Sequence, residues 1–153
     1  MAVADIPYQV WMHVAVVKSG SNMKIYVNGE LKGESDDMPY ALTNDRFTIG
    51  GFQTPNSRGY SCCAYRNVGF WRKALGADAI RERMTKLPRS NESGLIGYWP
   101  LDDGSGKTEA RNLVADGPAA KAINGGSLEW QRGANLPVVD GETTRSGMTI
   151  VVR

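Results

Sequence analysis

Two tight turns divide residues 11–33, WMHVAVVKSGSNMKIYVNGELKG, into three short segments rich in β-branched residues. Apolar residues alternate with other residues in these segments, as at Val14 and Val16, and a period of two is typical of a half-buried strand. Asn28-Gly29 is the strongest hairpin signal in the stretch, because a type I′ turn needs positive φ at both of its central residues. Three consecutive antiparallel strands are therefore predicted here.

The alternation continues further along the chain. Phe47 and Ile49 predict another strand, which ends at a glycine pair, and residues 51–60 are expected to form a polar loop. Val68 and Phe70 then share one face of a later strand. Trp71 alternates away from them, so its side chain is expected to be partly exposed.

One helix is predicted over residues 76–88. Asp78 suits its first turn, Ile80 and Met84 are spaced to lie on one face, and Pro88 ends it. The remainder of the sequence, with 18 glycines spread among short apolar segments, favours a β-sandwich with many turns.

Composition limits the classes of partner. The chain has 153 residues, 41% of them hydrophobic and 22% charged, which is ordinary for one globular domain. The net charge of +2 gives no electrostatic reason to expect nucleic acid as a partner. No apolar run is long enough for membrane insertion, and no signal peptide is visible in the printed sequence.

Several segments together resemble a known family. The stretch 11–33, FTIGG (47–51) and YRNVGFWRKALGADAI (65–80) are similar to the second half of laminin-G-like and pentraxin-like domains. GLIGYWPLDDGSG (94–106) resembles the way in which the first half of such a domain begins. The resemblance implies an all-β fold, a two-sheet antiparallel jelly-roll sandwich of the concanavalin A-like type with one short helix.

The order of these segments is unusual, because the family's second half comes first. Residues 1–153 are interpreted as a single domain in which 6–88 correspond to the second half and 94–153 to the first half. Either the domain is circularly permuted, with residues 148–153 pairing near the strand at 11–17, or the chain spans two half-domains of a tandem array. Permutation is favoured, because the termini of a sandwich often lie close together.

The histidine and the cysteines point to no catalytic group. His13 is the single histidine and is expected to be a buried structural residue, which leaves no triad and no metal cluster of the usual spacing. Cys62 and Cys63 are adjacent, so two reduced thiols are expected rather than a vicinal disulfide. Paired acids on a strand face, as glycosidases need, are also missing from the sequence.

Two loops, 33–41 and 51–60, are the predicted ligand-binding regions. A flat aromatic ring covers the C–H face of a pyranose while amides bond its hydroxyls, although rings in these loops could instead close the ends of the sandwich. The predicted ligand-binding residues are Tyr40, Phe52, Gln53, Asn56, Arg58, Tyr60 and Trp71.

Calcium is the one cofactor that the resemblance suggests. The pentraxin-like loop at 51–60 lacks carboxylates here, which counts against a site of that kind, because Ca²⁺ needs several oxygen ligands. A second oxygen-rich set could bind Ca²⁺, or its members could simply form Asx-turns within their own loops. This set consists of Asp36, Asp37, Asp102, Asp103 and Asp116.

The function predicted from these observations is non-catalytic recognition of a glycan or an extracellular protein, in a secreted or cell-surface protein. Two alternatives remain open. The domain could be a structural module that forms homo-oligomers by pairing or exchanging edge strands. It could also be a glycoside hydrolase, since one sandwich fold serves lectins, adhesion modules and enzymes.

Overall fold

The computed structural model describes most of the chain between residues 10 and 121 and a short segment near the C-terminus. The described ranges are 10–37, 47–54, 57–60, 64–103, 107–121 and 149–151, with 52–54, 57–60 and 149–151 described by their backbone. Within them lie one helix, α1 (Ala77–Arg83), and ten strands. The strands are β1 (Val14–Ser19), β2 (Asn22–Val27), β3 (Glu30–Ser35), β4 (Gly51–Thr54), β5 (Ser57–Tyr60), β6 (Val68–Trp71), β7 (Leu95–Trp99), β8 (Glu109–Ala110), β9 (Ala120–Lys121) and β10 (Thr149–Val151).

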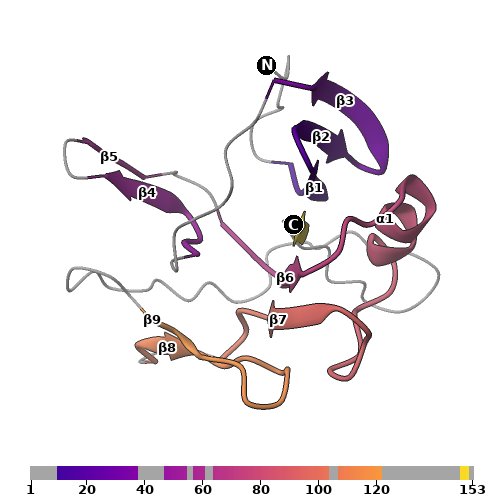
Figure 1. The fold of residues 1–153 in the computed structure, drawn as a ribbon. Coiled ribbons are helices and arrows are strands. Elements are labelled where there is room, and N and C mark those ends of the chain that lie inside the picture. The colour runs from indigo at the N-terminus through magenta and orange to yellow at the C-terminus, as the bar shows by residue number, and fades with distance from the viewer. Residues whose placement is uncertain are drawn as a thin grey trace.

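A six-stranded sheet in the order β3-β2-β1-β10-β6-β7 forms the centre of the molecule (Figure 1). Two further two-stranded sheets, β4-β5 and β8-β9, lie on one side of it, and α1 lies on the other. The structure is thus mostly β with antiparallel sheets and one helix, consistent with a concanavalin A-like β-sandwich. This confirms the predicted fold class.

The two predicted turns at the beginning of the chain are present. β1 pairs with β2 along its full length, and β2 pairs with β3 across the Asn28-Gly29 turn. Asn28 has φ of 49° and Gly29 has φ of 76°, the two positive angles expected of a type I′ turn. A side chain at residue 29 would also meet α1, because a Cβ there would lie 2.8 Å from Cγ of Arg81 and 2.9 Å from Sδ of Met84.

Helix α1 confirms the helix predicted over 76–88, although it ends earlier, at Arg83. Ile80 is fully buried, and Asp78 stands in the first turn as predicted. Turns replace the last residues of the predicted span, since the N–H groups of Thr85 and Lys86 both donate to the carbonyl of Glu82. The apolar side of α1 is thereby fixed against the six-stranded sheet.

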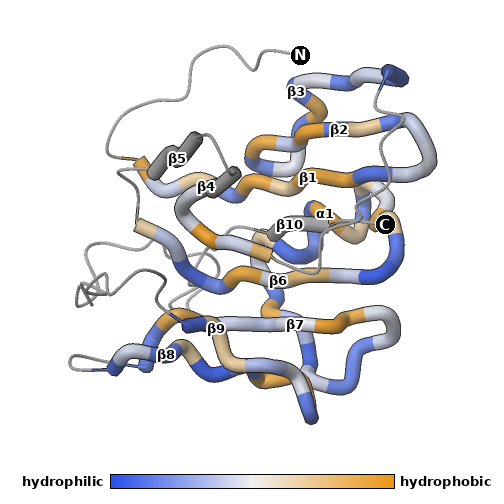
Figure 2. Tube along the Cα trace, turned by 60° about the vertical axis from the view of Figure 1, so that its left-hand side comes forward, coloured by the Kyte–Doolittle hydropathy of each residue, from blue (hydrophilic) through white to orange (hydrophobic). Residues whose placement is uncertain are grey.

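Figure 2 shows hydrophobic residues along β1, β6 and β7. Their side chains form a separate apolar cluster on each face of the sheet. The cluster on the helix side joins strands β1, β2, β6 and β7 to α1. Its buried members are Ala15, Val17, Tyr26, Trp71, Leu75, Ile80, Leu95 and Tyr98. The cluster on the opposite side has Val68, Trp99 and Ala110 as its buried members.

Strand β10, near the C-terminus, pairs with β1, near the N-terminus. Ala15 and Val16 of β1 pair with Thr149 and Ile150, so the pairing predicted between 148–153 and 11–17 is present. This pairing is parallel, and β10 is also parallel to β6. The prediction of an antiparallel sandwich thus holds for the other strand pairs and fails at β10. The sheet thus contains parallel as well as antiparallel pairs. These pairs do not test whether the two halves are circularly permuted, so the permuted order stays a prediction.

Four local predictions are wrong. Phe47 and Ile49 were expected to lie in a strand, yet residues 47–50 form no strand and β4 begins only at Gly51. The loop predicted over 33–41 begins later, because β3 continues to Ser35. Residues 51–60 were expected to form a polar loop, yet β4 and β5 pair as an antiparallel hairpin from Gly51↔Tyr60 to Thr54↔Ser57. Trp71 was expected to be partly exposed, yet it is 0% exposed because α1 covers its side of the sheet.

No helix in the described ranges has the length and hydrophobicity needed to cross a membrane.

Candidate binding site

Three stacked aromatic rings lie on the side of the sheet opposite α1. The ring centroid of Phe47 is 4.9 Å from that of Phe70 and 5.7 Å from that of Trp99, with interplanar angles of 27° and 25°. Phe47, Phe70 and the neighbouring Tyr65 are partly exposed, whereas Trp99 is buried. We call the four residues Phe47, Tyr65, Phe70 and Trp99 the aromatic face.

Trp99 gives the aromatic face a fixed base. Its indole Nε1–H donates to the carbonyl of Pro118 over 3.1 Å. A Cβ at Gly97, two residues earlier on β7, would come closer than 3.0 Å to the indole ring, so the ring lies directly over this glycine. A ring held by a hydrogen bond and by the sheet below it loses little further freedom when a ligand stacks beside it.

The segment before β6 is fixed by a buried hydrogen-bond network. Asn67 has a positive φ of 53° and its N–H donates to the carbonyl of Pro100. The hydroxyl of Tyr98 donates to Oδ1 of Asn67 over 3.1 Å. These bonds tie the residues that precede β6 to β7, and they set the place at which Tyr65 joins the aromatic face.

The β4-β5 hairpin holds four of the predicted ligand-binding residues. Gln53 lies directly opposite Arg58 in its register, and Phe52 lies opposite Gly59. Tyr60 lies opposite Gly51, and the hydroxyl of Thr48 donates to the carbonyl of Gly51 over 2.6 Å. Since alternate residues of a strand share a face, Gln53, Arg58 and Tyr60 belong to one face of the hairpin.

Of the remaining predicted ligand-binding residues, Trp71 is described by the structure and does not join this site. Trp71 is fully buried under α1, on the other side of the sheet. Tyr40 and Asn56 lie outside the described residues. The hairpin register therefore puts Gln53, Arg58 and Tyr60 on one face and Phe52 on the other, and Trp71 is not part of the hairpin.

The described part of the other predicted loop, 33–41, is a network of charged and polar side chains. The amide of Asn22 donates to Oε1 of Glu34 over 2.8 Å and to Oδ1 of Asp36 over 2.6 Å, and Nζ of Lys24 lies 3.2 Å from Oε1 of Glu34. The hydrogen bond from Asn22, followed by the one from Lys24, lowers the pKa of Glu34. Asp37 is exposed, and its N–H donates to the hydroxyl of Ser35.

Asp102 and Asp103 are both paired with one arginine. The guanidinium of Arg111 lies 2.7 Å from Oδ1 of Asp102 and 3.2 Å from Oδ1 of Asp103. The backbone N–H of Arg111 also donates to Oδ1 of Asp103. A cation that bound these carboxylates would have to compete with the arginine.

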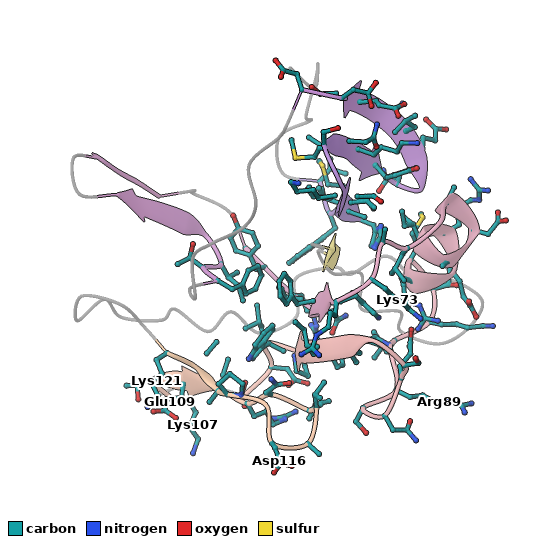
Figure 3. The ribbon with its side chains drawn as sticks, in the orientation of Figure 1. Lys73, Arg89, Lys107, Glu109, Asp116 and Lys121 are labelled. Carbon is teal, nitrogen blue, oxygen red and sulfur yellow. The ribbon has the colours of Figure 1, made fainter. Side chains whose placement is uncertain are left out.

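The other oxygen donors of this region serve the backbone. Oδ1 of Asn112 accepts from the N–H of Tyr98 and from that of Val114, two residues further on, which is the Asx-turn geometry. Asp116 is exposed at a turn with φ of 59° (Figure 3). Across the residues that the structure describes, no three His, Cys, Asp or Glu side chains form a group that could hold a metal ion. The proposed set of calcium ligands stays a prediction.

His13 is buried, with 2% of its surface exposed, in agreement with the structural role expected from the sequence. Its backbone N–H donates to Oδ1 of Asn28 and its carbonyl accepts from the N–H of Asn28, so it fastens the β2-β3 turn to the start of β1. Burial lowers the pKa of His13 from 6.5 to about 4. The imidazole is therefore neutral at physiological pH.

Sequence reasoning missed Phe47, Tyr65 and Phe70 as surface residues. The period of two predicts strands at Phe47 and Phe70, but Phe47 lies in the non-strand segment before β4. No period shows that such a segment packs its ring on that of Phe70. Cys62 and Cys63 lie outside the described residues. The signal that was available is local: a Gly-aromatic-Trp sequence occurs twice, at 69–71 and 97–99.

Comparison with known proteins agrees with the fold. The profile of the laminin-G-like family, described as the concanavalin A-like lectin/glucanases superfamily, matches residues 1–81, more than half of the chain. The chain belongs to this family. Because the superfamily includes lectins as well as glucanases, membership alone does not separate binding from hydrolysis.

Among solved structures, a crystal structure of an S-layer domain-containing protein from Clostridium thermocellum is similar to this chain. The TM-score is 0.47 and the sequence identity 28%, over 52% of this chain and 41% of that one. The chain thus spans about two fifths of that structure's length. No curated protein matches the sequence.

Proposed function

We propose that this protein is a non-catalytic recognition module that binds carbohydrate on the aromatic face and the adjoining β4-β5 hairpin. The observation that carries the proposal is the stack of Phe47 and Phe70 on the fixed ring of Trp99. Two of these rings remain partly exposed after the core has formed. Sugar recognition uses partly exposed aromatic rings together with amide and guanidinium groups. The aromatic face has such rings, and Gln53 and Arg58 of the β4-β5 hairpin are residues of the second kind.

The arrangement of acids supports binding rather than hydrolysis. A glycosidase needs two carboxyl groups about 5–9.5 Å apart across the scissile bond, one of them free to give a proton. Asp102 and Asp103 both face Arg111, and Oδ1 of Asp36 accepts from Asn22. An assay for new reducing ends on soluble polysaccharides tests this, and activity that disappears in Asp36→Asn or Asp37→Asn would show a hydrolase instead.

A glycan array with the full chain, repeated with a calcium chelator, tests the binding proposal. We expect retention of a subset of glycans that does not change with the chelator, because the aromatic face includes no carboxylate. Phe47→Ala should weaken the strongest interaction at least tenfold by removing the outer ring. Leu31→Ala, at an exposed apolar residue of β3, is the matched control and should bind normally.

Two outcomes would count against the proposal. One is an array without any retained glycan, and the other is equal binding by the Phe47→Ala and Leu31→Ala variants. Thermal unfolding of both variants shows whether each is folded when it is tested. In line with this role, we propose a secreted or cell-surface location.

A further inference from the structure

Strand β10 does not run in the direction that an alternating antiparallel sheet would require at its place. β10 is parallel to both β1 and β6, so β1 and β6 run in the same direction. The other three neighbouring pairs of this sheet, β3-β2, β2-β1 and β6-β7, are antiparallel. In a sheet that alternates throughout, the strand between β1 and β6 would run opposite to both. We call the space between β1 and β6 the strand slot.

Among the described residues, the segment that fills the strand slot pairs with β1 over only a short length. β2 forms six register pairs with β1, from Val14 to Ser19, whereas β10 forms two, at Ala15 and Val16. Val17, Lys18 and Ser19 therefore have no register partner on the β10 side among the described residues. Parallel pairing is also slightly less stable per residue than antiparallel pairing.

Both sides of the strand slot are apolar. On the α1 side it is bordered by Ala15 and Val17 of β1 and by Trp71 of β6, all members of the helix-side cluster. On the other side it is bordered by Val68 and Phe70 of β6. A strand buried on both faces consists of a nearly continuous apolar run rather than of alternating residues.

The outer edges of the same sheet are protected. β3 carries Glu30 and Lys32, which pair with each other, and charged residues of this kind oppose edge-to-edge association. On β7, the carbonyl of Tyr98 accepts from the N–H of Leu113 and its N–H donates to Asn112. A strand added from outside is thus better accommodated in the strand slot than at either edge.

From strand direction, pairing length and lining, we propose that the strand slot is a binding site for an extended apolar peptide segment of another polypeptide. The segment has about six residues, runs antiparallel to β1 and β6, and displaces β10. Main-chain hydrogen bonds to two strands supply the affinity, and the apolar lining selects the side chains. The strand slot shares Phe70 with the aromatic face, but the peptide would bind between the main chains of β1 and β6 rather than on the exposed rings. Neither proposal depends on the other.

Disulfide trapping with a synthetic peptide tests both occupancy and direction. The probe has six Val and Ile residues, two lysines at each end for solubility, and one cysteine at either its N- or its C-terminus. This cysteine is supplied as its mixed disulfide with thionitrobenzoate, so attack by the protein thiolate forms the new disulfide and releases thionitrobenzoate without an added oxidant. The protein is the full chain with Cys62→Ser and Cys63→Ser and one new cysteine at an end of β1, either Ser19→Cys or Val14→Cys. Circular dichroism confirms that each variant is folded.

An antiparallel segment places its N-terminus beside Ser19. We therefore expect the Ser19→Cys protein to be trapped at least tenfold faster by the probe with the N-terminal cysteine than by the other probe. The Val14→Cys protein should show the reverse preference. A control probe with two central prolines cannot join the ladders and should be trapped no faster than single cysteine carried on the same mixed disulfide.

Competition with β10 gives a second measurement. Ile150 pairs with Val16 on one side and with Phe70 on the other, so Ile150→Pro removes a ladder donor at the centre of β10. Trapping should then become about tenfold faster. The proposal is overturned by equal trapping of the two probes, by trapping no faster than with the proline control, or by no response to Ile150→Pro. It is overturned as well by the opposite preference, which would indicate parallel insertion, as when two copies exchange β10.

Discussion

The sheet contains two adjacent Gly-aromatic-Trp sequences, Gly69-Phe70-Trp71 on β6 and Gly97-Tyr98-Trp99 on β7. Their tryptophans lie on opposite faces of the sheet. In each, the indole ring lies over the glycine two residues before it, since a Cβ there would come closer than 3.0 Å to the ring. Trp71 faces α1 and is fully buried, whereas Trp99 faces away from α1 and belongs to the aromatic face.

The difference follows from the antiparallel register. Gly69 lies opposite Tyr98 and Phe70 lies opposite Gly97, so the two sequences are offset by one residue across the pair. A one-residue offset turns equivalent side chains to opposite faces of a sheet. The same three-residue sequence therefore builds the core on one side and the candidate binding site on the other.

The largest expected effect is the removal of either ring. Trp71→Ala should lower the free energy of unfolding by about 4–5 kcal/mol, and Trp99→Ala by about 3–4 kcal/mol, because a fully enclosed ring leaves the larger cavity. Urea denaturation measures both. A larger loss at Trp99 would contradict the view that α1 makes the tighter side of the sheet.

The glycines below the rings should give the next largest effect. Gly69→Ala and Gly97→Ala should each cost about 2 kcal/mol, because the new methyl group meets an indole ring that cannot move away freely. The same substitutions in Trp71→Leu and Trp99→Leu backgrounds should cost less than about 0.5 kcal/mol. Equal costs in both backgrounds would show that backbone freedom, not the ring, requires these glycines.

Acid should destabilise the fold through His13 by a smaller amount. Its folded pKa of about 4 lies below the usual 6.5, so between these values the unfolded chain binds a proton that the folded chain does not. Stability is therefore present above pH 6.5 and falls as the pH decreases through this window. From pH 7 to 5.5 the expected loss is about 1 kcal/mol. Denaturation of His13→Asn at both pH values should show less than half of this loss, and an undiminished loss would point to another group.

The smallest expected effect concerns the indole N–H groups. Nε1 of Trp99 donates to Pro118, whereas the buried Nε1 of Trp71 has no hydrogen-bond partner among the described residues. Replacement of each indole by benzothiophene, which has the same shape without the donor, should cost about 0.5–1 kcal/mol at residue 99 and almost nothing at residue 71. Thermal denaturation of the two proteins compares them, and equal costs would contradict the assignment of the bond.

The parts of the fold that depend on neighbouring residues in the sequence were predictable. Asn28-Gly29 requires two positive φ values wherever it occurs between strands, and the structure has them. Ile80 and the surrounding pattern identified the helix, and the alternation of Val68 with Phe70 identified their shared face. In each case the cause lies within a few residues, so no tertiary information is needed.

The candidate site was predictable only in part, because its members come from separate segments, two of them outside the strands. Residues 51–60 are rich in polar residues and contain Pro55, which favours a loop, yet pairing between β4 and β5 makes them a hairpin. Alternation within the strand predicts a partly exposed Trp71, because no local signal shows that α1 covers its side chain. Phe47 and Tyr65 join the aromatic face through packing that no spacing in the sequence encodes.

By itself, the sequence determined the turns, the helix and the alternation of apolar residues, because backbone sterics and side-chain periodicity act over a few residues. Only the tertiary structure decided which face of each strand is enclosed, which of two similar tryptophans belongs to the binding surface, and which strand lies between β1 and β6. Those outcomes depend on the register between distant strands, where a shift of one residue exchanges the two faces of a sheet.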